Sequence, residues 1–218
     1  MILRSVIPTF LVAVGTACAG GSGGPAVQVD WPQFAADRNC TPLIQGGTLK
    51  LGTQASRAVS AQMKAIFDAD QADRQGNIDW VKVGPRDLAR QVAVLKLLQG
   101  GKVATSEELV GAAFVFQHGN CPNHYLLAHA LADQAIRRGD RQPVTRFIYA
   151  ATYDRWLLST GRLQKYATQY MGDGDGCNMR LSATDPASTD AERTALRLPT
   201  LAEAEARAPT LNQPRCRK

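Results

Sequence analysis

Prolines and glycines divide the chain between residues 55 and 161 into five segments, each carrying apolar side chains at helical spacing. Pro85, Pro122 and Pro143 stand where a helix would begin, because the first turn needs no N–H from them. Thr105, followed three residues later by Glu108, has the pattern of an N-terminal capping box. Short connections predict antiparallel neighbours in a compact bundle. The expected helices cover residues 55–74, 85–100, 105–118, 122–139 and 143–161.

The helical pattern stops at Gly161. A glycine-rich turn then separates two short polar and aromatic stretches, which predicts a small irregular segment or hairpin. Asp173 and Asp175 in this turn lack the further ligands of a calcium loop. Two short helices are expected at 189–196 and 200–208. The predicted fold class is therefore all-α: a compact antiparallel bundle of about five main helices, this small segment and two short C-terminal helices.

The first 19 residues have the form of a secretory signal peptide. Arg4 precedes an apolar run, residues 6–14, that is too short to span a bilayer comfortably. Two endings stay open: cleavage after the "ACA" at 17–19 in a secreted, soluble periplasmic protein, or a lipid-modified Cys18 in an outer-membrane lipoprotein. Either ending predicts export. We expect a flexible tether and irregular arm over residues 20–54, and one helical domain over 55–218.

An even number of cysteines remains when Cys18 is set aside, and in an oxidising compartment this predicts two disulfides. The four are Cys40, Cys121, Cys177 and Cys216. All three connectivities are open from the sequence. We favour Cys40 with Cys216, which would tie both ends of the chain to the domain, and Cys121 with Cys177.

The net charge of +6 comes from basic residues scattered along the chain. No basic stripe is interleaved with aromatic residues that could stack on bases, so nucleic-acid binding is not predicted. The expected partner is an unknown small molecule or an envelope protein. Membrane association is expected only through a lipid anchor, should Cys18 carry one.

The three histidines, His118, His124 and His129, fall close together in the sequence. His124 and His129 would point about 140° apart on one helix, so they cannot share an ion, and no metal site is predicted. His124 lies on the apolar face of its helix, and His129 is one turn from Asp133. His118 lies in the last turn of its helix, beside exposed carbonyl groups.

Two carboxylates occupy positions that should face the core. Asp70 continues the apolar stripe of the first helix, and Asp154 fills a gap in the stripe of the fifth. A buried carboxylate is costly unless it is paired. The candidate cations are Arg74, Arg155 and Arg162. Such pairs occur both in structural networks and in active sites, and we favour the structural role.

Four short motifs follow one another along the chain: "DQADR" at 70–74, "FQHG" at 116–119, "YDRWL" at 153–157 and "GRLQKYATQY" at 161–170. Their order and spacing resemble a bacterial family known only as a domain of unknown function. The resemblance covers roughly residues 59–198 and implies a mostly helical domain with no established activity. The chain departs from the family's pattern at Leu163 and Ala167, where proline and glycine are usual.

The resemblance groups seven polar residues and implies one polar cluster at the end of the bundle, covered by residues 166–170. The apolar periodicity independently selects two of the seven, Asp70 and Asp154. The seven residues are Asp70, Arg74, His118, Asp154, Arg155, Gln164 and Gln169.

Two functions are compatible with these features, and neither requires a cofactor. The first is a non-catalytic exported envelope protein whose helical domain binds a ligand or partner. The second is a hydrolase-type enzyme with His118 and Asp154 as an acid/base pair, in which Arg74 or Arg155 binds an anionic group and Gln169 a polar one. No nucleophile motif or phosphate loop supports the enzyme. We favour the binding protein.

Overall fold

The structure is a computed structural model that describes residues 28–29, 39–44, 49–76, 78–174, 176–212 and 216. The expected signal peptide, the lipidation candidate Cys18 and most of the expected tether lie outside the described residues. Asp175 of the glycine-rich turn also lies outside them.

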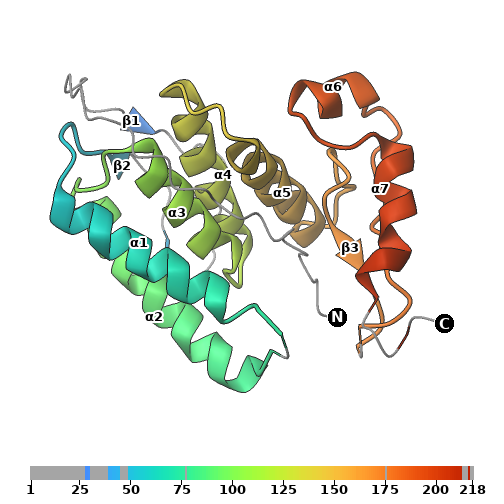
Figure 1. Cartoon of the computed structure of the whole chain (residues 1–218), viewed down its shortest axis with the longest axis horizontal. Coiled ribbons are helices and arrows are strands. Elements are labelled where there is room, and N and C mark those ends of the chain that lie inside the picture. Colours follow the sequence, from blue (N-terminus) through green and yellow to red (C-terminus); the bar gives the residue numbers. More distant parts are fainter. Residues whose placement is uncertain are drawn as a thin grey trace. The chain divides into compact units, whose positions relative to one another are not determined.

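Helices dominate the described chain, which confirms the all-α fold class (Figure 1). The long helices are α1 (Arg57–Ala72), α2 (Trp80–Gln99), α3 (Ser106–Gln117), α4 (Pro122–Arg137) and α5 (Pro143–Ser159). The expected hairpin is present as β3 (Tyr170–Met171), paired antiparallel with β4 (Arg180–Leu181). The expected short helices are α6 (Asp190–Ala195) and α7 (Leu201–Arg207), and a 3-10 turn follows at Ala208–Leu211.

The chain divides into two compact units between α4 and α5. We call the part that ends at Arg141 the N-terminal unit and the part that begins at Gln142 the C-terminal unit. The sequence predicts one domain over 55–218; in the structure α1–α4 belong to the N-terminal unit and α5 belongs to the C-terminal unit. Among the described residues, each unit contains one disulfide.

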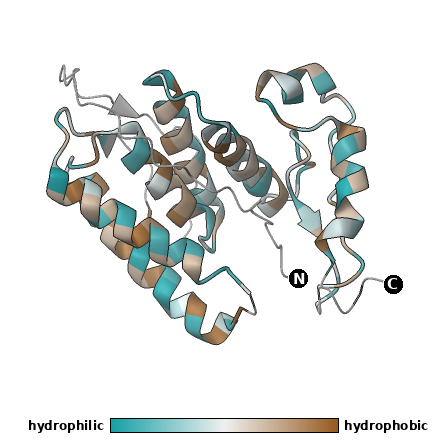
Figure 2. Ribbon diagram, viewed as in Figure 1, coloured by the Kyte–Doolittle hydropathy of each residue, from teal (hydrophilic) through white to brown (hydrophobic). Residues whose placement is uncertain are grey.

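α3 is the central helix of the N-terminal unit. It packs against α1, α2 and α4, and nine of its twelve residues are buried. A helix that is apolar on all sides must be covered on all sides; the ring of Phe114, for example, meets Phe67 of α1 edge to face at 5.4 Å. α1 and α2 run side by side as amphipathic helices, and polar and apolar residues alternate along both in Figure 2. The predicted capping box of Thr105 and Glu108 is present.

α2 begins five residues earlier than the sequence predicts, at Trp80 instead of Pro85. The carboxylate of Asp79 accepts a hydrogen bond from the backbone N–H of Lys82 and so caps the helix one turn upstream. Pro85 removes one hydrogen bond from the second turn, the one that the carbonyl of Val81 would accept. Val81 is 85% exposed, so water can reach this part of the helix.

A small core packs beside the hairpin in the C-terminal unit. Tyr170 of β3, Met179 and Ala208 are buried there together. The Tyr170 hydroxyl also donates a hydrogen bond to the carbonyl of Ala204 on α7, at 3.0 Å. An apolar contact and a hydrogen bond therefore join the hairpin to the C-terminal helix.

Two features of the backbone are not predicted from the sequence. Gln28–Val29 (β1) pairs antiparallel with Leu49–Lys50 (β2), in the part of the chain expected to be irregular. Ala167 and Arg197 have φ of 60° and 58°, the left-handed conformation that favours glycine. Ala167 is the position at which glycine is usual in the resembling family. Within the described ranges, no helix is long and apolar enough to cross a membrane.

We expect Arg197→Gly to stabilise the protein. Arg197 follows α6 in a Schellman-type ending: its N–H donates to the carbonyl of Thr194, and the N–H of Leu198 donates to the carbonyl of Arg193. Glycine removes a steric cost of about 1–2 kcal/mol at positive φ. It also raises the entropy of the unfolded chain, so the expected net gain is roughly 0.5–1 kcal/mol.

Urea denaturation should show a higher midpoint for Arg197→Gly with an unchanged m value. The control is Arg180→Gly in strand β4, where glycine should destabilise by about 0.5–1 kcal/mol. Stabilisation by both variants, or by neither, would contradict the explanation from positive φ.

Candidate functional site

The N-terminal end of α4 binds the arm at residues 39–44. Cys121 immediately precedes α4 and forms a disulfide with Cys40, with the two Cα atoms 5.4 Å apart. The side-chain amide of Asn123 donates to the carbonyl of Ile44 at 3.2 Å. The arm is therefore attached to α4 by both a covalent bond and a hydrogen bond.

The second disulfide joins Cys177 to Cys216. The pairings favoured from the sequence, Cys40 with Cys216 and Cys121 with Cys177, are therefore wrong. The physical reason is that each cysteine pairs within its own unit. The favoured pairings would instead have tied the two ends of a single domain together.

His124 is fully buried and completes the contact between α4 and the arm. Its Nε2 lies 2.8 Å from the carbonyl oxygen of Pro42, which can only accept, so Nε2 carries the proton. Nδ1 then accepts a hydrogen bond from the backbone N–H of Asn120 at 3.2 Å. Gly119 makes this packing possible, because a Cβ at that residue would lie 2.3 Å from Nδ1 of His124. Asp133, the expected partner of His129, forms an ion pair with Arg137.

A network of ion pairs joins the C-terminal end of α1 to α2. Arg74 lies 3.2 Å from Asp70 and 2.7 Å from Asp87. Arg90 lies 2.8 Å from Asp73 and 2.7 Å from Asp87. We call these five residues the ion-pair cluster. Their side chains are 1–15% exposed, so water screens the charges weakly.

His118 adds an imidazole to the ion-pair cluster from the C-terminal end of α3. Its Nδ1 lies 3.1 Å from the carboxylate of Asp70. Burial alone raises the pKa of Asp70, but His118, Arg74 and Arg90 together outweigh burial and hold that pKa below its usual range. A carboxylate on one ring nitrogen is also how a catalytic histidine is oriented. The carboxylate beside His118 is thus Asp70, whereas the sequence proposes Asp154 as its partner.

Asp154 of α5 binds the backbone at residues 165–168. One carboxylate oxygen accepts hydrogen bonds from the N–H groups of Lys165 at 2.7 Å and Tyr166 at 2.8 Å. The other accepts from the N–H and the hydroxyl of Thr168, at 3.0 and 2.7 Å. Burial raises the pKa of Asp154 above its ordinary value, and these hydrogen bonds act in the opposite direction. Both oxygens are thus occupied by one turn of the C-terminal unit.

Two glutamines extend this network. The amide nitrogen of Gln164 donates to the carbonyls of Gln169 at 3.1 Å and Ser182 at 2.7 Å. The amide nitrogen of Gln169 donates to the carbonyl of Ala151 on α5 at 3.1 Å, and its amide oxygen accepts from Nε of Arg155 at 3.3 Å. These side chains connect residues 164–169 to α5 on one side and to the region after β4 on the other.

Arg193 of α6 takes part in the same network and is not singled out by the sequence. It is 2% exposed. Its guanidinium donates to the carboxylate of Asp190 at 2.9 Å and to the carbonyl of Lys165 at 3.1 Å. Arg162, a candidate partner for a buried carboxylate, instead lies over the ring of Trp156, 3.9 Å from the ring centroid.

The structure divides the seven grouped residues between the two units. Within the N-terminal unit it brings together Asp70, Arg74 and His118. Within the C-terminal unit it places Asp154, Arg155, Gln164 and Gln169 around the segment at 164–169. The sequence did not single out Asp73, Asp87 or Arg90 of the ion-pair cluster. Asp87 and Arg90 lie three residues apart on one helix, a spacing at which opposite charges pair, and this could have marked those two.

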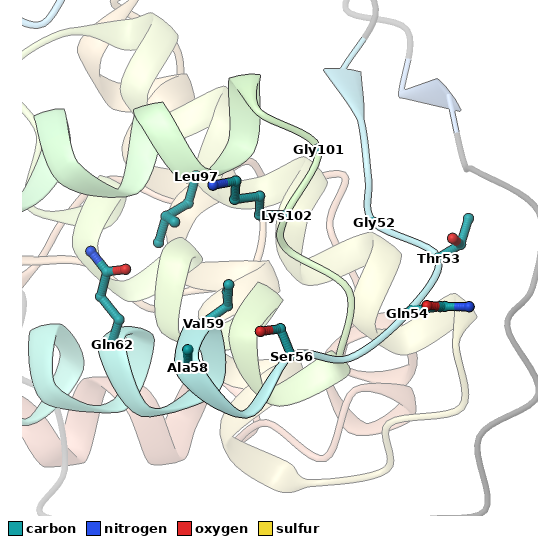
Figure 3. Close-up of a pocket in the computed structure, with 10 residues that line it drawn as sticks. All are labelled: Gly52, Thr53, Gln54, Ser56, Ala58, Val59, Gln62, Leu97, Gly101 and Lys102. Atoms are coloured by element: carbon teal, nitrogen blue, oxygen red, sulfur yellow. The ribbon is translucent and has the colours of Figure 1, made fainter.

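A pocket of about 560 Å³ opens in the N-terminal unit, between the start of α1, the segment at 52–54 and the C-terminal end of α2 (Figure 3). Neutral polar side chains, an apolar wall and one cation line it. The neutral polar residues are Thr53, Gln54, Ser56 and Gln62, the apolar residues are Ala58, Val59 and Leu97, and the cation is the exposed Lys102. Gly52 and Gly101 complete the lining. Figure 3 shows Val59 and Gln62 projecting from α1 toward Leu97 of α2. The sequence marks none of these residues as part of a binding site, because they form no motif and only the fold brings them together.

No family model, curated protein or solved structure matches the chain. The resemblance to a bacterial family therefore stays a prediction. The function has to be argued from the chemistry of the sites themselves.

Asp70→Asn should destabilise the protein in a pH-dependent way. At neutral pH the variant loses the charge that pairs with Arg74 and Arg90, which should cost about 3 kcal/mol. Since the pKa of Asp70 in the folded state is below its ordinary value of 3.8, the carboxylate contributes stability above that pH and loses it as the pH falls through the folded pKa. The difference between wild type and variant should therefore shrink on acidification below pH 3.8.

Urea denaturation at a series of pH values measures this difference. The matched control is Asp68→Asn on the same helix, where the ion pair with Lys64 is more than half exposed and the change should stay within about 0.5 kcal/mol. A difference between wild type and Asp70→Asn that does not vary with pH would refute the electrostatic role of Asp70.

Asp154→Ala should loosen the turn at residues 165–168. The substitution leaves three backbone N–H groups, that of Thr168 buried and those of Lys165 and Tyr166 part-buried, without their acceptor, and we expect a loss of about 3–5 kcal/mol. Amide hydrogen exchange should show lost protection at Lys165, Tyr166 and Thr168. Asp185→Ala is the control, because Asp185 accepts one exposed hydrogen bond, from the N–H of Ala187. Unchanged protection at all three amides would show that Asp154 does not hold the turn.

Proposed function

We propose that the chain is an exported bacterial envelope protein that binds a small polar ligand without transforming it. The observation that carries this proposal is the pocket of about 560 Å³ in the N-terminal unit. Small-molecule sites commonly have volumes of about 300–1,000 Å³ and combine apolar walls with a few polar groups. This pocket has both features.

The lining indicates the class of ligand. Among the described residues that line the pocket, Lys102 carries the only charge, and Gln54 and Gln62 supply amides that can donate and accept. Val59 and Leu97 offer an apolar surface. A small organic acid with hydroxyl or amide groups would match the cation, the amides and the apolar wall together.

The buried polar clusters support a binding role over a catalytic one. Asp154 uses both carboxylate oxygens on the backbone and side chain of residues 165–168. The ion-pair cluster matches three carboxylates with two arginines and with His118 at its edge. Groups that already have partners in the folded protein hold helices together, and to bind a substrate they would first have to lose those partners.

Two further observations support export. The disulfides Cys40–Cys121 and Cys177–Cys216 suit an oxidising compartment. The N-terminal sequence has the form of a signal peptide, with cleavage after Ala19 and lipidation at Cys18 as the two alternatives. An envelope location also suits a protein that captures small molecules outside the cytoplasm.

Binding can be tested by NMR titration of the ¹⁵N-labelled protein with amino acids, small dicarboxylates and monosaccharides. We expect saturable shifts of the amides at 52–62 and 97–102 with an acidic probe. Ala58→Trp should fill the pocket and weaken binding at least about tenfold, a loss of roughly 1.4 kcal/mol. Lys102→Gln should weaken binding of acidic probes more than binding of neutral ones.

Ala65→Trp is the matched control, because Ala65 is exposed on the same helix but lies outside the pocket lining. It should leave binding unchanged. Equal weakening by Ala58→Trp and Ala65→Trp, or probe-induced shifts only outside the two segments, would count against the pocket as the binding site.

A hydrolase-type enzyme is the second candidate, and the contact of 3.1 Å between His118 and Asp70 is the observation that favours it. In that case His118 would act as the acid or base and Asp70 would orient it. A panel of esters, amides and phosphate monoesters tests this function. Hydrolysis that is lost in His118→Ala but kept in Ala58→Trp would favour the enzyme.

A further inference from the structure

One corner of the N-terminal unit brings three metal-ligating side chains together. The sulfurs of Cys40 and Cys121 and a ring nitrogen of His124 all lie within 4.8 Å of one another. All three residues are buried, with exposed fractions of 4% or less. In the part of the chain that the structure describes, no other group of three such side chains meets this condition.

The hydrogen bonds of His124 already fix the tautomer that a metal ligand needs. Because Nε2–H donates to the carbonyl of Pro42, the lone pair is on Nδ1. Histidines that bind metals usually donate their other N–H to a carbonyl or carboxylate in this way. Nδ1 now accepts a hydrogen bond of 3.2 Å from Asn120, which a stronger metal–nitrogen bond would replace.

We propose that reduction of the Cys40–Cys121 disulfide converts this corner into a Zn²⁺ site formed by two thiolates and His124. The reductant is a dithiol: its two sulfurs are oxidised to a disulfide, and the two sulfurs of the protein accept two electrons and two protons to become thiols. Zn²⁺ then displaces both protons, forms two Zn–S bonds and one Zn–N bond, and keeps a water in the fourth position.

The charges favour this ligand set. Two thiolates cancel the charge of Zn²⁺, and neutral imidazole adds none, so the complex is neutral. A neutral complex avoids most of the desolvation cost of a buried charge. At tetrahedral zinc the two sulfurs lie about 3.8 Å apart, a separation that side-chain rotation can provide because the Cα atoms are already 5.4 Å apart.

The second disulfide provides an internal comparison. Cys177 and Cys216 form a bond of the same kind in the C-terminal unit, but they belong to no such three-ligand group among the described residues. The proposal therefore assigns the metal to Cys40 and Cys121, and not to Cys177 and Cys216. It is also independent of the ligand pocket, because no residue of this corner lines that pocket.

Metal binding can be measured on the full chain, with Cys18→Ser throughout to remove the fifth thiol. Oxidised and dithiol-reduced protein are titrated with Zn²⁺ by competition with a chromophoric chelator, and with Co²⁺ for its thiolate charge-transfer band. We expect one equivalent bound by the reduced protein and none by the oxidised protein. Binding should persist in Cys177→Ser/Cys216→Ser and vanish in Cys40→Ser/Cys121→Ser. His124→Asn should weaken binding more than about tenfold, because loss of even an outer-shell partner of a metal ligand typically costs about 10–100-fold.

Circular dichroism, recorded at each step, measures the helix content and so separates loss of the metal site from unfolding. A reduced protein that stays helical and binds no Zn²⁺ would overturn the proposal. So would undiminished binding in His124→Asn or in Cys40→Ser/Cys121→Ser, which would place the metal elsewhere. If reduction lowers the helix content, Zn²⁺ must restore it, and failure to do so also overturns the proposal.

Discussion

The carboxylate of Asp154 is the interaction on which the arrangement of the C-terminal unit depends. Backbone N–H groups of the turn at 165–168 are directed inward, where each needs an acceptor. Asp154 supplies acceptors for three of them and for one hydroxyl. Lys165 shows the consequence: its N–H binds Asp154 of α5, and its carbonyl binds Arg193 of α6. One residue of a turn thus connects two helices through its two backbone groups.

The N-terminal unit is stabilised differently. Its centre is α3, which is apolar on nearly every side and needs few polar partners. Charged groups are placed at the edge, where the ion-pair cluster joins α1 to α2. The hydrophobic effect does not depend on direction, whereas a hydrogen bond to a carboxylate requires a particular distance and angle between the two groups. The long helix of the C-terminal unit, α5, buries charged side chains such as Asp154 and Arg155. This unit therefore relies more on directed bonds.

The sequence predicted most of the helices, because apolar periodicity and end signals are local. Pro122 and Pro143 marked true starts, and Glu108 completed a capping box. Pro85 misled because a cap at Asp79 outweighed one lost hydrogen bond. The sequence also identified Asp70 and Asp154 as buried carboxylates, since an acid that interrupts an apolar stripe stands out. Arg74 could be proposed as a partner of Asp70 because it lies one turn further on the same helix. Arg90 and the turn at 165–168 could not be found, because they become partners only when separate segments meet in space.

The disulfide pairing and the neighbours of His124 could not be predicted for the same reason. Cys40 precedes Cys121 by 81 residues, and nothing in the local sequence marks the two as neighbours. The pocket is similar, since Gln62 and Lys102 become neighbours only when α1 and α2 pack. His124 looked like one member of a histidine cluster, but its ring binds the carbonyl of Pro42 on the arm and the N–H of Asn120. Residues that lie close together in a sequence need not share a site.

The placement of the disulfides has a consequence for the covalent structure of the chain. Both crosslinks close within a unit, and neither spans the connection between Arg137 and Pro143. Arg141 in that connection is exposed, so a trypsin-like protease can reach it. A single cut there would leave two fragments with no covalent bond between them, each with its own crosslink intact. A protease that cuts this connection would therefore remove the covalent link between the pocket and the Asp154 network without reducing a disulfide.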